Sequence, residues 1–299
     1  MTSAEPSGVW GTAVGVARVR AMESRREQPL FQDPLAAAFA AAGGLSLQPR
    51  VPAPGSAPWD EAKLRRWGGV ALSIVISTRF LDDLLTAAAD AGCRQVVLLG
   101  AGMDSRAYRL DWPSGTRLFE LDTAEPLAFK ESVLRAERAV PRCERRVVAV
   151  DLRDDWPAAL AAAGHDPALP TVWIAEGLLI YLPQEDVQRL LERVGGLSAP
   201  GSRMGLTLGS PQTLERFAQD QGTAADMWVS VMPDDPVGWL AGLGWDAETF
   251  SIRERAAAYG RSIPEPDESQ TQPQPKPKPK PQPKTQPPTP GGLVSAVRR

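Results

Sequence analysis

Short, uninterrupted apolar runs alternate with helical stretches through the middle of this chain, and this alternation constrains the fold more than any other feature. The runs are Gln95–Leu99, Thr116–Leu121, Val147–Val150, Thr171–Ala175 and Arg203–Leu208, with a weaker one at Phe250–Arg253. The helical stretches are Glu125–Val140, Asp154–Ala163 and Pro183–Val194. Continuous apolar strands are buried on both faces, and helices between them act as crossovers. The sequence therefore predicts an α/β fold with a mostly parallel, Rossmann-like sheet and helices on both faces.

The first ninety residues lack this alternation and are helical in pattern. Gly11–Arg26 has small and apolar residues at helical spacing, and Asp33 followed by Pro34 predicts the start of a helix that runs to Ala42. Gly43–Pro58 is expected to be a loop, and Trp59–Ala91 one or two amphipathic helices ended by a glycine.

The C-terminal end has a different composition. Residues 264–290 contain eleven prolines, a Lys-Pro alternation and no aromatic residue. Such a segment buries too little apolar surface to offset its ordering entropy. We expect residues 262–299 to form a disordered, polyproline-II-like tail, and a specific peptide ligand is the less favoured interpretation.

Charge and residue counts exclude several functions. Residues 1–261 hold 27 basic and 33 acidic residues, which argues against a nucleic-acid-binding surface. One histidine, His165, and two cysteines, Cys93 and Cys143, exclude a Cys/His zinc cluster, and no metal site is expected. Without an 18-residue apolar run or a signal peptide, the chain is expected to be cytoplasmic and free of membrane contacts.

The most specific local signal follows the first apolar run. That run leads into Gly100-Ala101-Gly102 and then into a helical stretch. Glycines at the end of a strand let a ligand approach the bare backbone, and the following helix presents its N–H groups. Asp122 stands twenty residues after Gly102, at the end of the next run, where an acid reaches the hydroxyls of a ribose. The pattern predicts a nucleoside-containing cofactor.

The details of the turn favour S-adenosylmethionine over a dinucleotide. A dinucleotide fingerprint has a third glycine where this chain has Ser105, and Asp104 places a negative charge where a pyrophosphate would lie. A cofactor with a sulfonium and an ammonium tolerates that acid. Two alternatives stay open: an NAD-dependent oxidoreductase, and a fold that binds the cofactor without turnover.

Acids also follow the third and fourth runs, at Asp151 and Glu176. Ligands of open α/β sheets bind outside the carboxyl ends of the strands. We therefore expect Asp122, Asp151 and Glu176 to line one crevice.

The motif Leu-Leu-Gly-Ala-Gly-Met-Asp-Ser-Arg-Ala-Tyr-Arg-Leu at 98–110 resembles the cofactor motif of the leucine carboxyl methyltransferase family. It is most similar to an actinobacterial branch of S-adenosylmethionine-dependent methyltransferases. The same branch is matched in order and spacing by Gly11–Ala13, Arg20–Glu23, Ser77–Asp82, Phe119–Asp122, Ala149–Trp156, Ala175–Leu182 and Ala257–Arg261. The resemblance covers roughly residues 8–261 and leaves out the proline-rich segment.

This resemblance implies a class I methyltransferase fold with a seven-stranded, mostly parallel sheet. Its implied domains are a helical cap at 1–90 and a cofactor-binding domain at 91–261. Asp122 would hold the ribose, and Asp151 and Leu152 would bracket the adenine. Gly100 would approach the methionine part, with Arg79 on its carboxylate, and Gly102 would also belong to the cofactor-binding residues. Glu176 would border the same pocket.

A mechanism also follows from the residue types. A carboxylate acceptor is already ionised at neutral pH and needs no base, whereas a phenol or amine usually needs one. His165 precedes the fourth run, away from the expected crevice, and no histidine remains for a hydrolase triad. We therefore expect methylation of a carboxylate, or of a hydroxyl, on a small molecule. No residue is expected to act as a base; Tyr181 and Arg20 would align the acceptor. The sequence leaves the acceptor's identity and the oligomeric state open.

Overall fold

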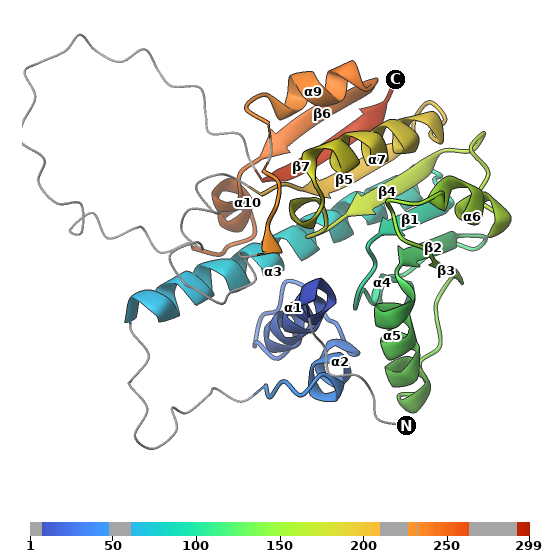
Figure 1. The fold of residues 1–299 in the computed structure, drawn as a ribbon. Coiled ribbons are helices and arrows are strands. Elements are labelled where there is room, and N and C mark those ends of the chain that lie inside the picture. Colours follow the sequence, from blue (N-terminus) through green and yellow to red (C-terminus); the bar gives the residue numbers. More distant parts are fainter. Residues whose placement is uncertain (1–7, 48–60, 210–226, 232, 263–291) are drawn as a thin grey trace, which may run out of the picture.

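A seven-stranded sheet forms the centre of the computed structural model, which describes residues 8–47, 61–209, 227–231, 233–262 and 292–299 (Figure 1). Its strands are β1 (Gln95–Leu99), β2 (Arg117–Asp122), β3 (Glu144–Ala149), β4 (Thr171–Ala175), β5 (Arg203–Thr207), β6 (Trp245–Phe250) and β7 (Leu293–Arg298). The spatial order is β3-β2-β1-β4-β5-β7-β6, in which only the pairings made by β7 are antiparallel. The predicted α/β fold with a mostly parallel sheet is confirmed.

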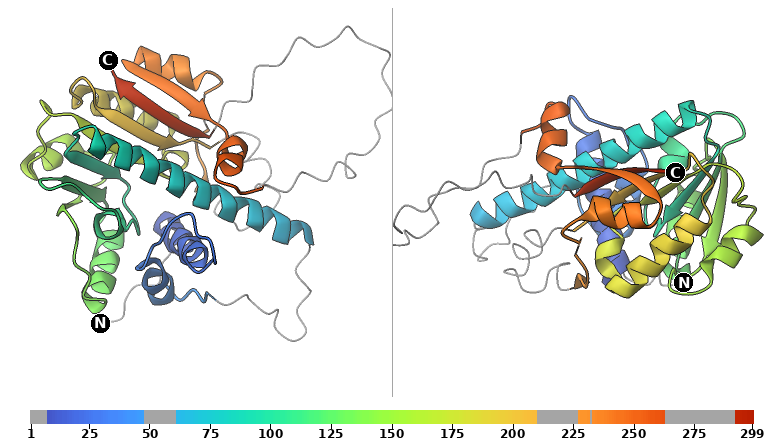
Figure 2. Two further views of the ribbon diagram at one scale, coloured as in Figure 1. Left: turned by 180° about the vertical axis from the view of Figure 1, so that it is seen from behind. Right: turned by 90° about the horizontal axis from the view of Figure 1, so that it is seen from above.

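Helices cover both faces of this sheet. They are α1 (Gly8–Ser24), α2 (Ala36–Ala42), α3 (Glu61–Asp90), α4 (Arg106–Arg109), α5 (Ala124–Ala136), α6 (Trp156–Ala162), α7 (Gln184–Gly196), α9 (Pro236–Gly242) and α10 (Ile252–Ala258), with a 3₁₀ turn η1 (Leu179–Tyr181). One face packs against α3, α5 and α10, and the other against α6, α7 and α9 (Figure 2).

Strand β1 shows why the sheet carries two cores. Successive side chains of a strand point to opposite faces, so Val96 and Leu98 join the core beneath α3 while Val97 and Leu99 join the core beneath α7. All four are at most 2% exposed. Full burial of an aliphatic side chain contributes roughly 1.5–3 kcal/mol, so this strand stabilises both layers.

The sequence located β1 and β4 to the residue, but it misplaced β6. We expected a strand at Phe250–Arg253, whereas β6 ends at Phe250. The reason is a helix start: the Ser251 hydroxyl accepts from the Glu254 amide at 3.1 Å, and the Glu254 carboxylate accepts from the Ser251 amide at 3.2 Å. This capping box begins α10 and ends the strand.

The expectation that residues 262–299 form a disordered tail is wrong at its end. Residues 293–298 form β7, which is inserted between β5 and β6 with Val294 and Ala296 at most 1% exposed. The preceding proline-rich residues dominate the composition of this region, so the short apolar segment that completes the sheet was not recognised. The cofactor-binding domain therefore does not end at residue 261. Residues 263–291 lie outside the described residues, as do residues 48–58 of the loop predicted at Gly43–Pro58.

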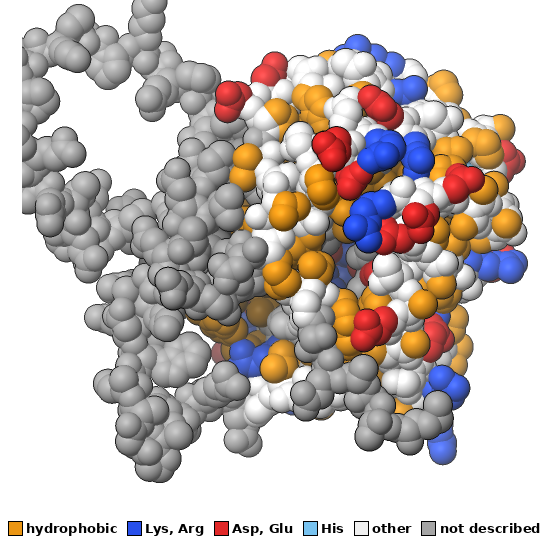
Figure 3. Space-filling model, in the orientation of Figure 1, with side chains coloured by type: hydrophobic (Ala, Val, Ile, Leu, Met, Phe, Trp, Pro, Cys, Tyr) orange, Lys and Arg blue, Asp and Glu red, His pale blue; other side chains and the backbone are white. Residues whose placement is uncertain are grey.

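The helices α1 and α2 pack together, beside α3 on one side and α5 on the other (Figure 1). Helix α3 also contributes to the core under the sheet, since Leu81 and Leu84 press against Gly205 in β5. Over the described residues, no helix combines the length and apolar character that a bilayer crossing requires. On the face seen in Figure 3, acidic and basic side chains are interleaved.

Candidate functional site

The turn after β1 folds back onto the end of β2, as the glycine motif predicts. Gly100 and Gly102 both have positive φ, +65° and +42°. The Ala101 amide donates to the Leu121 carbonyl at 2.9 Å, and the Gly102 amide donates to Asp122 Oδ2 at 2.7 Å. A Cβ at Gly100 would lie 2.8 Å from Leu178 Cδ1, so the turn is closely lined by the loop after β4.

The carboxylate of Asp122 is held mainly by backbone N–H groups, with a longer hydrogen bond of 3.5 Å from the Thr123 hydroxyl. Besides the Gly102 amide it accepts from the Thr123 amide at 2.7 Å. Burial raises the pKa of Asp122, and these two N–H groups oppose the rise. The side chain stands at the carboxyl end of β2 with no ion-pair partner among the described residues.

Strand β3 brings Asp151 and Leu152 to the same edge of the sheet. The Val150 amide donates to the Asp122 carbonyl at 2.8 Å, which keeps the two strand ends in register. Asp151 is bound by its neighbour Arg153, whose hydrogen bonds hold the pKa of this carboxyl below its ordinary value. Leu152 packs on the core beneath α7.

Glu176, at the end of β4, faces the helical cap. Its Oε2 lies 3.0 Å from Arg20 Nη2 of α1, and its Oε1 accepts from the Thr78 hydroxyl of α3 at 3.0 Å. Arg20 Nε in turn donates to that hydroxyl at 3.2 Å. The structure therefore joins two predicted site residues, Glu176 and Arg20, through a threonine that the sequence analysis did not assign.

Strands β1 and β4 are neighbours at the point where the strand order reverses. In open α/β sheets the ligand crevice lies at this switch point, outside the carboxyl ends of the strands. The Gly100 turn follows β1 and Glu176 follows β4, so both predicted cofactor elements border it.

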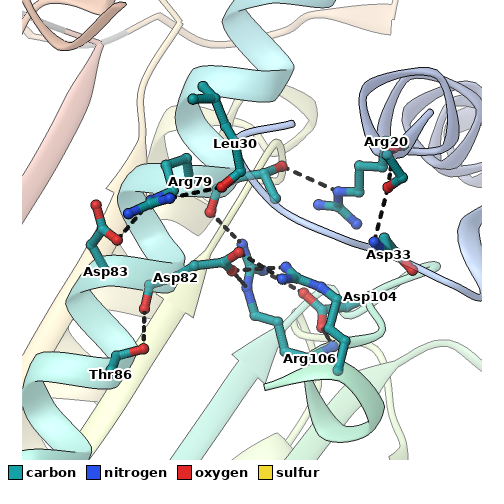
Figure 4. Close-up of polar contacts among 12 residues, drawn as sticks. Arg20, Leu30, Asp33, Arg79, Asp82, Asp83, Thr86, Asp104 and Arg106 are labelled. Carbon is teal, nitrogen blue, oxygen red and sulfur yellow. Dashed lines mark hydrogen bonds and ion pairs between the residues drawn. The ribbon is translucent and has the colours of Figure 1, made fainter. Parts of the chain in front are cut away.

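A fully buried arginine, Arg106, links these two loops (Figure 4). Its Nη1 pairs with Asp104 and lies 2.8 Å from Glu176 Oε2, while its Nε donates to Asp82 Oδ1 at 2.8 Å. Asp82 also accepts from Arg109 at 2.6 Å. Arg106 and Asp82 were both inside matched motifs, but nothing in their spacing indicated that they would meet.

The position of Asp104 corrects the argument drawn from its charge. We expected this carboxylate to face the ligand and repel a pyrophosphate. It instead accepts from the Arg106 amide at 2.7 Å and pairs with the guanidinium of the same residue. Burial would raise the pKa of Asp104, but Arg106 and Arg20 bring it well below the ordinary value. Its charge is therefore compensated within the protein.

Arg79 is not brought to the switch point. Its Nε donates to Asp83 at 2.8 Å, its Nη1 donates to the Leu30 carbonyl at 2.7 Å, and it lies over the Tyr259 ring. These contacts place it on an open groove of about 530 Å³ between α3 and the segment before α2. Its assignment to the methionine carboxylate stays a prediction that these contacts do not support.

Helix α1 lies against the loops at the switch point. A Cβ at Gly102 would lie 3.0 Å from Ala13 Cβ, and the Tyr181 hydroxyl lies 3.4 Å from the Thr12 hydroxyl. At the other side Trp10 packs against Phe129 of α5, with ring centroids 5.4 Å apart and the ring planes tilted by 50°. Tyr181 thus contacts the cap beside the Gly102 turn.

The single histidine lies at the opposite end of the sheet. His165 precedes β4, is 6% exposed, and its Nε2 lies 3.0 Å from the Thr171 hydroxyl. Its ring packs against Phe119 and Trp173. Burial lowers the pKa of His165 to about 4, so the imidazole is neutral at physiological pH. His165 therefore lies away from the carboxyl ends of the strands, as expected, and it packs in the core.

Comparison with known proteins agrees with the resemblance seen in the sequence. Residues 13–195 match the leucine carboxyl methyltransferase family model. A relative from Frankia alni is 68% identical over 98% of this chain and 96% of its own, and one from Streptomyces avermitilis is 63% identical over 99% and 97%. Both are named as S-adenosyl-L-methionine-dependent methyltransferases.

Among solved structures, a duf574 family protein from Streptomyces avermitilis has a TM-score of 0.54 at 14% identity, covering 95% of this chain and 96% of its own. At that sequence identity the similarity supports a shared fold and nothing more. The family match and the close relatives together establish that this chain belongs to the leucine carboxyl methyltransferase family.

Proposed function

We propose that this S-adenosylmethionine-dependent methyltransferase transfers the cofactor's methyl group to a carboxylate oxygen of a small-molecule acceptor. The methyltransferase class follows from family membership. The choice of acceptor rests on one observation: the chain's single histidine is buried and hydrogen-bonded at the far end of the sheet from the crevice.

The residues at the switch point fit this cofactor. Asp122 offers a carboxylate for the ribose hydroxyls at the end of β2, beside the positive-φ turn at Gly100 and Gly102. Leu152 supplies an apolar surface for the adenine beside Asp151. Glu176 provides a negative group on the side where the cationic methionine part would lie. The cofactor supplies an electrophilic methyl on a sulfonium.

The chain's own task is then alignment and exclusion of water. Methyl transfer is an in-line displacement, which gains most from a fixed angle between nucleophile, methyl and sulfur. Helix α1 closes over the crevice and would keep water out, with Tyr181 and Thr12 at its border.

The two carboxylates that pair with Arg106, Glu176 and Asp104, are weak bases. Burial alone would raise the pKa of Glu176 and Asp104, but Arg106 lowers it in both cases. Neither carboxylate can therefore remove a proton from a phenol or an ammonium efficiently. An acceptor carboxylate, with an ordinary pKa near 4, attacks without that step.

Arg20 is the cap residue best placed to orient the acceptor. Its Nε and Nη2 contact Thr78 and Glu176, and within the described part of the chain its Nη1 has no partner. A guanidinium can bind a second carboxylate through that nitrogen. Arg20→Ala should raise the acceptor KM by about tenfold, the value of one charge-assisted hydrogen bond, while Arg20→Lys should recover part of the loss.

The proposal is tested with methyl-labelled S-adenosylmethionine and matched pairs of small carboxylic acids and phenols. The product should be a methyl ester, which mild alkali hydrolyses to labelled methanol. The transfer rate should stay flat with pH above the acceptor's own pKa. Base-stable label, or a rate that follows the ionisation of a phenol, would contradict a carboxylate acceptor while leaving the methyltransferase class intact.

A further inference from the structure

Arg106 has no role in the function proposed above, and yet it is one of the few fully buried charged residues among those the structure describes. Its side chain is 0% exposed and contacts Asp82, Asp104 and Glu176, three carboxylates from three separate parts of the chain. Its Nη2 also approaches the Thr78 carbonyl of α3 at 3.4 Å. A buried ion group of this kind is costly unless each member is compensated, so its geometry is strongly constrained.

We infer that Arg106 is a positioning residue for the cofactor: it fixes the Glu176 carboxylate relative to the Gly100–Gly102 turn without touching the ligand. The inference rests on the proposed use of a cationic cofactor at this switch point. Asp104 follows the turn by two residues, and Glu176 directly follows β4. A single guanidinium nitrogen, Nη1, contacts both carboxylates and therefore sets the spacing between the two loops.

The charges of this cluster balance. Three cations, Arg20, Arg106 and Arg109, face three anions, Asp82, Asp104 and Glu176. Two further charged groups interact electrostatically with members of this cluster: Lys130 of α5 with Asp104, and Asp33 with Arg109. Removing one buried cation leaves an excess carboxylate in a low-dielectric site, and such a group takes up a proton instead of staying ionised.

This balance links Arg106 to ligand affinity. Ionised Glu176 attracts a sulfonium or ammonium, whereas its protonated form does not. Without Arg106, protonation of the cluster should rise as the pH falls, and affinity for the cofactor should fall with it. With Lys at this position the charge remains, but the compact ammonium cannot bridge Asp82 and Glu176 as the planar guanidinium does.

The test measures S-adenosylmethionine binding by calorimetry between about pH 6 and pH 9 for wild type, Arg106→Met and Arg106→Lys. Arg106→Met should bind at least about tenfold more weakly at the acidic end, and the loss should shrink as the pH rises. Arg106→Lys should keep the flat profile of the wild type with a smaller, pH-independent loss. Arg117→Met, which removes a guanidinium bound to Gly164 and Gln95 at the other end of the sheet, is the matched control.

A purely structural role predicts a different result. Both Arg106 variants would then melt at lower temperature, as Arg117→Met is expected to do. Their affinity at permissive temperature and its pH profile would be unchanged, and this result would overturn the inference. If Arg106→Met does not fold, an affinity equal to wild type for Arg106→Lys would overturn it as well. Failure of the wild type to bind S-adenosylmethionine would refute the proposed function itself, and this inference with it.

Discussion

Gly100 occupies a position where any residue with a Cβ would be strained. Its φ of +65° is strained for a residue with a Cβ, and that Cβ would lie 2.8 Å from Leu178. Gly100→Ala should cost about 1–2 kcal/mol of stability and weaken cofactor binding by about tenfold, because the turn must shift. Gly115→Ala, at φ +79° with open space around it, is the control: it should show a similar stability loss and unchanged binding. Melting temperature and calorimetry separate the two effects.

His165 makes the stability of the protein depend on pH. Its folded pKa of about 4 lies below the ordinary value of 6.5, so the unfolded state binds the proton first as the pH falls. This group's contribution is fully present above pH 6.5 and is lost on acidification toward pH 4, by about 3 kcal/mol in all.

Chemical denaturation between about pH 6.5 and pH 4 tests the contribution of His165 to this pH dependence. The difference in unfolding free energy between wild type and His165→Gln should narrow as the pH drops, because Gln does not titrate. A constant difference would show that the imidazole is not held neutral by the fold.

The positions of some site residues can be predicted from the sequence, whereas the contacts of others cannot. Gly102 and Asp122, which the sequence assigned to the cofactor turn and to the ribose, lie in hydrogen-bond contact, because they follow the ends of the neighbouring strands β1 and β2. The contact between Thr78 and Glu176 depends on how α3 is rotated against the sheet, and residue spacing alone does not give that rotation. For the same reason Arg79, one residue further on the helix, points to Asp83 and Tyr259.

At the scale of elements, β7 is the largest difference from the sequence-based prediction. Residues 293–297 pair with β5 and residues 293–298 pair with β6, so β7 is an internal strand that comes from the end of the chain. A window dominated by proline and lysine gave no strand signal, although Leu293, Val294 and Ala296 are nearly inaccessible. The strands between helices were predictable because each is a local apolar run; β7 depends on a distant pairing.

Truncation after residue 261 should therefore unfold the protein. It removes β7 and leaves the backbone groups of β5 and β6 unpaired within the sheet, where each lost partner costs about 1–3 kcal/mol. Circular dichroism and size-exclusion chromatography should report an aggregated or unfolded chain. Replacing Lys276, Lys278 and Lys280 by Gln leaves β7 in place and should not change the melting curve. A truncated chain that melts like the wild type would contradict the observed strand order.

At the scale of the whole molecule, topology and cap together define the site. The strand order brings the ends of β1, β2 and β4 to one edge, and α1 closes that edge through Ala13, Thr12 and Arg20. Neither layer makes the crevice alone. The family resemblance implied a helical cap over a cofactor-binding sheet. The charge network that joins the cap, α3 and the sheet could not be predicted from the sequence and is seen only in the structure.

The most direct test is calorimetric titration of the full-length protein with S-adenosylmethionine and S-adenosylhomocysteine, in parallel with Asp122→Ala. The wild type should bind both ligands with one site per chain. The variant should lose about 2–4 kcal/mol of binding free energy, since the ribose would lose its charged hydrogen-bond acceptor. Absence of binding by the folded wild type, or equal affinity in wild type and Asp122→Ala, would contradict the account of this site.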